Sequence, residues 1–264
     1  MDAIGNIWQL VILNPLINVL IVLAHVLFNN FGLAIIVMTV VFNLLLYPIT
    51  RRQMKVAKAQ QDMAPKLAEL RKKYAKDSQK LAEEQMKLYR ELGISPAGCL
   101  LPMFAQMPIW IALYQSIIRV MAANPESFVN LSGYLYSWSV VYNALPLNNN
   151  FLWFNLANPD MLLALLVGVA MLVQQRMTTP AVSDPQTKAQ TQTMQIMMPM
   201  MFVFLSMTFP SGLALYWVVS NIFRIVAQYF YSGWGGLEGT MSGLKARLFS
   251  SKRKTAEQKY IKKK

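Results

Sequence analysis

The chain has 264 residues, of which 55% are hydrophobic and 14% are charged, a composition that excludes an ordinary soluble domain and predicts an integral membrane protein. Its charge is one-sided, with 25 Lys and Arg against 12 Asp and Glu, and these charges are expected outside the hydrocarbon. One cysteine, Cys99, and one histidine, His25, exclude an intramolecular disulfide framework and a zinc cluster.

The N-terminal segment, residues 1–30, contains an apolar run from Ile7 to Phe28 that is interrupted by Asn14-Pro15 and Asn18. The run is long enough to cross a bilayer core of about 30 Å. As a spanning helix it would leave a cytosolic N-terminus with Asp2 as its only charged side chain. We therefore expect a helix that lies at the membrane interface, with a sixth span as the alternative. No basic region precedes the run, so we expect no cleavable signal peptide.

Five further apolar runs predict transmembrane helices. The first takes up residues 31–50 and ends at Arg51-Arg52, and the second lies in residues 97–121. The other three, within residues 97–231, are Met161–Met177, Met194–Thr208 and Gly212–Tyr231. The predicted fold is an all-α integral membrane protein with five transmembrane helices, an N-terminal interfacial helix and a cytosolic helical hairpin.

The distribution of basic residues predicts the orientation of these spans. Residues 51–95 contain 12 Lys and Arg, and the tail, residues 232–264, contains 9, whereas residues 122–160 contain none. Basic loops remain in the cytosol. Residues 51–96, the loop 178–193 and the tail are therefore expected in the cytosol, and the loop 122–160 and the N-terminus outside.

The cytosolic segment 51–96 consists mostly of helix-forming residues, and Asp77-Ser78 divides it into two halves. This pattern predicts an antiparallel helical hairpin that is too charged to bury a core of its own. It is either a solvated connector or an arm that captures substrates. The apolar positions of its first half, which would make the contact, are Met54, Met63, Leu67, Leu70 and Tyr74.

Polar side chains recur at helical spacing in the first and last spans. They are Thr39, Asn43, Tyr47 and Thr50 in the first, and Trp217, Asn221, Arg224 and Gln228 in the last. Intramembrane polar groups are costly, so these stripes are expected to face each other or a wet cavity. Dry hydrogen bonding between helices is the alternative. The third and fourth spans have short apolar stretches, which favours a depression open to the cytosol.

The fourth span is rich in methionine: Met194, Met197, Met198, Met200, Met201 and Met207. Flexible thioethers suit a surface that accepts varied apolar partners, although packing between helices is the simpler interpretation.

Several strings together resemble one known family. They are Tyr47-Pro48-Ile49-Thr50, Met86-Lys87-Leu88-Tyr89, Gly98-Cys99-Leu100-Leu101-Pro102, Gln106-Met107-Pro108-Ile109, and Phe209-Pro210-Ser211-Gly212-Leu213 with Leu215-Tyr216-Trp217. Their order and spacing across most of Gly32–Tyr231 resemble the YidC/Oxa/Alb family of membrane protein insertases, in the short five-span form of bacterial YidC.

The resemblance implies a hydrophilic groove, open to the cytosol and to lipid, through which short polar tails or hairpins of nascent membrane proteins pass while their apolar segments enter the bilayer. By this analogy the groove residues are Asn43, Gln106, Gln174, Trp217 and Asn221. It also implies a multi-pass protein of the bacterial inner (plasma) membrane, and action either alone or beside the Sec translocon.

One position departs from the family pattern. The family usually has Arg or Lys four positions before the Tyr of the Tyr-Pro motif, and this chain has Asn43 there. Asn43 and Arg224 both lie 8 residues before the cytosolic ends of their spans, Arg51 and Ser232, which is about 12 Å of helix. We hypothesise that Arg224 supplies the charge that Asn43 lacks, with snorkelling to headgroups as the alternative.

The competing function is a small-solute transporter or channel, but no carboxylate lies in the predicted spans to bind protons or cations. No Asp pair or Ser/His set lies there either, so we expect no enzyme activity, catalytic residue, metal, cofactor or small-molecule substrate. The basic tail is expected to contact either ribosomal RNA or anionic lipids.

Overall fold

The computed structural model describes residues 2–75, 77–91, 101–121, 125–179 and 185–237. This part of the chain is largely helical, in keeping with the all-α class. Its main helices are α1 (Asp2–Trp8), α2 (Asn14–Val26), α3 (Phe31–Leu45), α4 (Tyr47–Lys73), α5 (Ser78–Glu91), α6 (Leu101–Val120), α9 (Met161–Thr178), α10 (Pro185–Ser206) and α11 (Ser211–Ser232). Cys99 and most of the basic tail lie outside the described residues.

The centre of the molecule is a bundle in which α11 contacts α3, α6 and α9, and α9 also contacts α10. The buried core draws on all of these helices except α10, with Phe31, Ile35, Leu113, Ile117 and Leu213 among its fully covered side chains. Gly212 allows a close approach, because a Cβ there would lie 3.2 Å from Ile35 Cδ1 and 3.3 Å from Ile117 Cδ1. The start of α11 is thereby held between α3 and α6.

The first predicted span, residues 31–50, is bent in the structure. The helix ends at Leu45, not at Thr50, and α4 continues from Tyr47 at a bend of 64°. Pro48 lies in the first turn of α4, and its ring nitrogen has no hydrogen to donate to the preceding turn, which favours a bend at this position. Tyr47 and Thr50 therefore lie in α4, beyond the bend, whereas Thr39 and Asn43 lie in α3.

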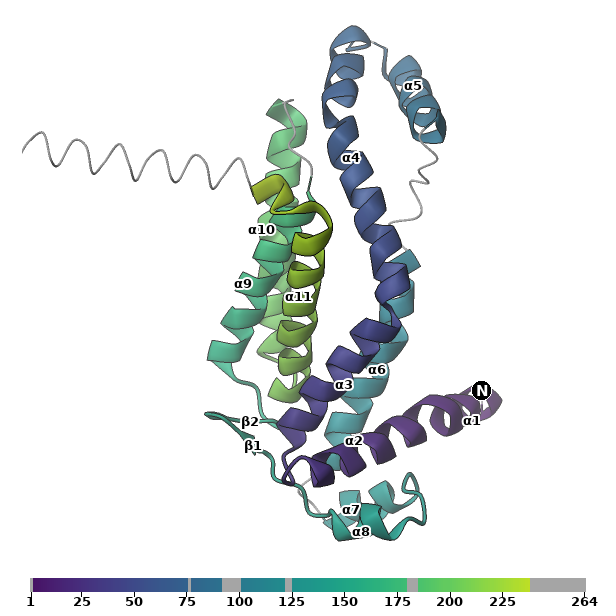
Figure 1. The fold of residues 1–264 in the computed structure, drawn as a ribbon, viewed down its shortest axis with the longest axis vertical. Coiled ribbons are helices and arrows are strands. Elements are labelled where there is room, and N and C mark those ends of the chain that lie inside the picture. The colour runs from purple at the N-terminus through teal and green to yellow at the C-terminus, as the bar shows by residue number, and fades with distance from the viewer. Residues whose placement is uncertain (1, 76, 92–100, 122–124, 180–184, 238–264) are drawn as a thin grey trace, which may run out of the picture.

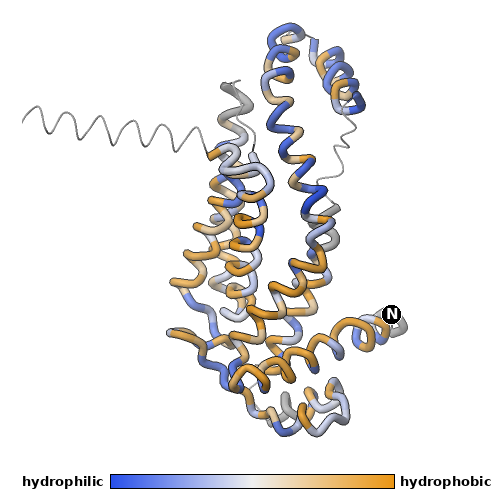
Figure 2. The backbone as a smooth tube through the Cα atoms, viewed as in Figure 1, coloured by the Kyte–Doolittle hydropathy of each residue, from blue (hydrophilic) through white to orange (hydrophobic). Residues whose placement is uncertain are grey.

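The α4 helix extends beyond the bundle, and α5 lies folded back beside the far end of α4 (Figure 1). Figure 2 shows this pair as predominantly hydrophilic, in contrast to the apolar bundle. The base of α4 contacts α6, α9 and α11, and Gln61 Nε2 donates a hydrogen bond of 2.9 Å to the carbonyl oxygen of Met177 in α9. The lower part of α4 is thus attached to the bundle, while α5 has no buried residue.

The fourth span is embedded in a longer helix than expected. Within the predicted cytosolic loop 178–193, α10 already begins at Pro185 and continues to Ser206, and the cytosolic placement of this segment stays a prediction. Residues 185–193 are mainly Gln, Thr, Lys and Ala, which can form a helix without an apolar face, and Pro185 is well suited to a first helical position.

The N-terminal run is one nearly continuous helical rod across Asn14-Pro15. The π-helical turn Gln9–Leu13 (η1) joins α1 to α2, which accommodates the missing N–H of Pro15 without a break. Figure 1 shows this rod transverse to α9 and α11, across the end of the bundle where α3 begins. Trp8 Nε1 donates to Gln115 Oε1 of α6 at 2.9 Å, so the rod is attached at its outer part as well.

The segment that precedes α9 folds at the end of the molecule opposite the α4–α5 turn (Figure 1). It contains α7 (Pro125–Ser132), α8 (Ser139–Asn143) and a two-stranded hairpin of β1 (Asn150–Phe151) and β2 (Phe154–Asn155). Asn18 of α2 is fully buried and bridges to this segment: its Nδ2 donates to the Tyr134 carbonyl at 2.8 Å, and its Oδ1 accepts from the Tyr136 N–H at 2.8 Å. The segment is therefore a packed cap over the bundle.

Three helices of the described residues are long and apolar enough to cross a membrane, namely Gly5–Val26, Met161–Thr178 and Ser211–Ser232, and the bent pair α3–α4 is a fourth candidate. Neither α6 nor α10 is among them in the part of the chain described. The apolar helices agree with a multi-pass membrane protein, and the count of five spans stays a prediction.

Candidate functional site

A polar cluster lies where α3 meets α11, and Asn43 is its member from α3. The side chain of Asn43 is only 6% exposed. Its Nδ2 donates to the Thr39 carbonyl at 2.8 Å and to Ser220 Oγ on α11 at 3.2 Å. Because the second hydrogen bond crosses between helices 177 residues apart in sequence, it sets the rotation of α3 relative to α11.

Gln106 connects α6 to the same helix. Its Nε2 donates to the hydroxyl oxygen of Tyr216, and its Oε1 accepts a hydrogen bond of 3.0 Å from the guanidinium Nη2 of Arg224. The amide therefore uses its donor and its acceptor on two different side chains of α11. A hydrogen bond to a charged donor is stronger than one between neutral groups, so this bond holds Arg224 toward α6.

Tyr216, Ser220 and Arg224 follow one another at intervals of four residues, which places them on one face of α11. Tyr216 and Ser220 are buried, and Arg224 is partly buried. We name the set Asn43, Gln106, Tyr216, Ser220 and Arg224 the polar seam. It joins three helices through side-chain hydrogen bonds in an otherwise apolar bundle.

Two buried donors beside the seam have no hydrogen-bond partner within the described residues, the Nε of Arg224 and the Nε1 of Trp110. Trp110 lies one turn after Gln106 on α6, and its ring stacks on Trp217 of α11 with centroids 6.1 Å apart and planes inclined by 21°. An unpaired buried donor costs about 1–3 kcal/mol. The face between α6 and α11 can therefore accept groups that carry free acceptor oxygens, such as water, peptide carbonyls or carboxylates.

The aromatic wall of this face extends to α10. The ring of Phe202 meets Trp217 edge-on, with centroids 5.2 Å apart, and Phe209 packs edge-on against Trp110 at 5.9 Å. Trp217, predicted as a groove residue, thus lies beside the seam but supplies packing surface and not a hydrogen bond to it.

Two other predicted groove residues are not joined to the seam. Asn221 donates to the carbonyl of Trp217 on its own helix at 2.8 Å. Gln174 lies partly buried on α9, and among the described residues no hydrogen bond connects its side chain to the seam. Gln228, the last residue of the predicted stripe, is buried and donates to Ser232 Oγ at 2.7 Å.

The sequence reasoning missed Tyr216, Ser220 and Trp110. The first two lie eight and four residues before Arg224, and a stripe aligned on Arg224 instead of Trp217 would have found them. Trp110 carries no such polar signal.

The predicted contact residues of the α4–α5 hairpin differ in exposure. Met54 and Met63 are buried, at the base of α4 where it meets the bundle, whereas Leu67, Leu70 and Tyr74 are partly exposed. Unless α4 moves, only Leu67, Leu70 and Tyr74 can therefore contact another molecule.

The methionines of α10 are mostly exposed, which is contrary to the simpler interpretation that they pack between helices. Met194, Met197, Met198, Met200 and Met201 are all exposed, Met197 at 63%, and Phe204 lies exposed on the same helix. The reason is that α10 packs mainly against α9 and only slightly against α11, which leaves the positions of these methionines uncovered. These thioethers form an apolar surface on the outside of the bundle.

Among the described residues, no group of three or more His, Cys, Asp or Glu is placed to hold a metal ion.

Comparison with known proteins finds relatives over most of the chain. Residues 22–234 match the family described as 60Kd inner membrane protein. A relative from Oceanobacillus iheyensis is 37% identical over 229 residues, covering 83% of this chain and 81% of its own length. One from Alkalihalophilus pseudofirmus is 36% identical, with coverage of 85% and 82%. One from Haemophilus influenzae is 33% identical over 84% of this chain but only 36% of its own length. Each carries the name membrane protein insertase YidC.

Proposed function

Because this chain belongs to the 60Kd inner membrane protein family and its relatives carry the name membrane protein insertase YidC, we propose that it is a membrane protein insertase. The observation that carries the proposal is the polar seam together with its unpaired donors. Within the described part of the chain, the Nε of the Arg224 guanidinium on α11 and the indole Nε1 of Trp110 on α6 are buried without a hydrogen-bond partner. Such groups are costly unless they bind something.

The seam offers a polar segment a path into the bilayer without a change in any covalent bond. A short tail or hairpin of a nascent membrane protein would exchange water for Arg224, Gln106 and the indole of Trp110. This lowers the cost of carrying peptide groups through the low-dielectric layer. Substrates with acidic tails would be stabilised most in the seam, because Arg224, the cation of the seam, can pair with their carboxylates. The apolar segment of the substrate would meet the exposed methionines of α10 and pass into lipid.

In the proposed topology α3, α6, α9, α10 and α11 span the inner membrane of a bacterium. The α1–α2 rod, although long enough to span, would lie at the outer interface, because it runs transverse to α9 and α11. Residues 125–160 would close the outer end of the seam. The α4–α5 hairpin and the tail would lie in the cytosol, in accordance with their basic residues.

The partners follow from this placement. Nascent membrane proteins are the substrates, and the outer part of α4, with Leu67, Leu70 and Tyr74, is the surface available for their capture. The basic tail would contact the ribosome or anionic lipids, and the Sec translocon is a possible neighbour in the membrane. No small-molecule substrate is involved.

Reconstitution tests the function directly. Liposomes with the purified full-length chain should promote insertion of a membrane protein with a short translocated tail, measured by protection of that tail from external protease, and should not release an encapsulated small dye. Empty liposomes provide the baseline. Dye release or solute uptake without insertion would instead establish the competing transporter or channel function.

Accessibility to water-soluble thiol reagents tests the half-open path. In a background with Cys99→Ser, a cysteine at Asn221, which is partly exposed, should react with a reagent added on the cytosolic side only. Ser137→Cys, in the exposed part of the outer cap, is the matched control and should react only from the outside. Reaction of Asn221→Cys from both sides would indicate a continuous channel.

A further inference from the structure

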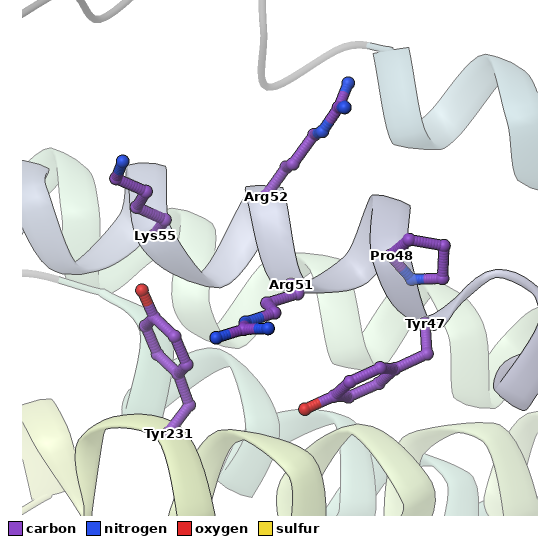
Figure 3. A pocket seen from close by; sticks show the side chains of 6 residues that line it. All are labelled: Tyr47, Pro48, Arg51, Arg52, Lys55 and Tyr231. Atoms are coloured by element: carbon purple, nitrogen blue, oxygen red, sulfur yellow. The ribbon is translucent and has the colours of Figure 1, made fainter.

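A second polar site lies outside the seam, where α4 leaves the bundle. A cavity of about 530 Å³ opens between the first turns of α4 and the end of α11, and its lining consists of Tyr47, Pro48, Arg51, Arg52, Lys55 and Tyr231. Figure 3 shows the guanidinium of Arg51 between the rings of Tyr47 and Tyr231, with the Tyr231 side chain rising from α11 toward α4. Arg52 and Lys55 also line the cavity, but their charged ends extend away from it, so Arg51 is the cation that points between the two phenol rings (Figure 3).

None of these cations has an anionic partner within the described residues. The ion pairs found there lie on and beside α5, at Lys80 and Lys87. Both α3 and α11 lack Asp and Glu, and the first acidic residue of α4 is Asp62, seven positions after Lys55. The cavity therefore carries a local excess of positive charge that an anion would neutralise.

The surroundings of the cavity identify the kind of anion. On the bundle side, α3 ends in Leu44 and Leu45, which are exposed, the latter at 69%. The end of α11 presents Val226 and Phe230, the latter 82% exposed. Figure 2 shows the change from apolar to hydrophilic colouring along α3 and α4 at this level. An apolar surface thus borders a basic pocket, which is the pattern that an amphiphile with an anionic head requires.

We propose that this cavity binds the headgroup of an anionic phospholipid, with its phosphate at Arg51 between the two tyrosines and its acyl chains along the exposed ends of α3 and α11. Arg51 provides a planar fork that matches phosphate oxygens, and the tyrosine hydroxyls can donate to the same group. A lipid held at the bend would fasten α4 to α11. The proposal rests on the membrane topology of the proposed function but not on insertion activity.

A polypeptide carboxylate could also meet these cations, but the exposed apolar residues beside them favour an occupant that has acyl chains. Inorganic phosphate shares the headgroup chemistry without the chains. The two alternatives are therefore separate outcomes of one binding experiment.

The test uses the full-length protein in neutral detergent, titrated with phosphatidylglycerol or with phosphatidylcholine of the same chain length, and native mass spectrometry to count bound lipids. Arg51→Gln removes the charge that points into the cavity. The matched control, Lys58→Gln, removes a charge from an exposed position of the same helix. A charge near the headgroup contributes about fivefold to binding, so the cavity variant should weaken the tightest phosphatidylglycerol site by about fivefold.

The expected pattern is a loss confined to phosphatidylglycerol and to the cavity variant, with a loss under about threefold in the control variant. Equal losses in both variants, or equal affinity for the two lipids, would overturn the proposal. So would displacement of the lipid by an acidic peptide, or binding of inorganic phosphate as tight as that of the lipid. Circular dichroism verifies folding, and Tyr231→Phe, which removes only a hydroxyl, should independently weaken the site by about threefold.

Discussion

Replacement of Arg224 by asparagine removes the only cation of the polar seam. In the structure its Nη2 is bound to Gln106 Oε1 at 3.0 Å, and its Nε has no partner among the described residues. A hydrogen bond to a charged group contributes about 1.5–3 kcal/mol. If a substrate carboxylate binds this guanidinium during insertion, its loss should slow insertion of a substrate with an acidic tail by at least about tenfold.

The same geometry predicts a rescue. Asn43 is bonded to Ser220, and Arg224 lies four residues beyond Ser220, about 6 Å along α11. An arginine at position 43 therefore begins about one helical turn from the lost charge. We expect the double variant Asn43→Arg/Arg224→Asn to regain most of the activity, measured as the initial rate of tail protection in liposomes.

Two comparisons make this experiment decisive. Arg176→Asn removes a charge from an exposed position of α9 and should leave the rate within about twofold. A substrate whose tail carries no acidic residue should be nearly indifferent to Arg224→Asn, because it gains no ion pair. If Arg224→Asn is silent with the acidic tail, or if Asn43→Arg fails to restore the rate, the reasoning that Arg224 replaces the usual first-span charge is refuted.

Three further predictions concern packing and the seam. Asn18→Ala leaves the Tyr136 N–H without its acceptor in a buried site and should lower the free energy of unfolding by about 2–4 kcal/mol, measured by thermal denaturation in detergent; an unchanged midpoint would contradict the bridging role. Gly236→Ala places a Cβ about 2.5 Å from the backbone carbonyl oxygen of Thr179 and should lower the melting midpoint by several degrees, since a backbone atom cannot rotate away. Gln106→Leu removes both seam contacts of α6 and should cost about 2–4 kcal/mol of stability and slow insertion; a fully active, fully stable variant would exclude a role for the seam.

Sequence periodicity located the polar residues but not their partners. Of the stripe predicted on α11, namely Trp217, Asn221, Arg224 and Gln228, only Arg224 belongs to the seam, which also uses Tyr216 and Ser220. Periodicity defines which residues share a face of one helix. It carries no information on how that helix is rotated against its neighbours, and this rotation decides that Ser220 meets Asn43 while Asn221 bonds to its own backbone.

The pattern of apolar runs also could not predict a change in helix direction that depends on a single residue. The bend at Leu46 comes from Pro48, and it separates Tyr47 and Thr50 from the stripe on the first span. The same bend creates the cavity lined by Tyr47, Arg51 and Tyr231. A run of apolar residues predicts the length of a helix. The direction of the helix axis after a proline depends instead on what the following helix packs against.

The sequence by itself determined the class of protein and the existence of its helices. The apolar share of 55% and the placement of basic residues suffice for a membrane protein, and α11, found at Ser211–Ser232, differs from the predicted Gly212–Tyr231 by one residue at each end. Hydrophobic burial and backbone hydrogen bonding act on every residue of a run, so composition is enough to predict them. Only the tertiary structure decided which side chains of α3, α6 and α11 meet, because those contacts depend on the relative rotation and spacing of helices that are far apart in the chain.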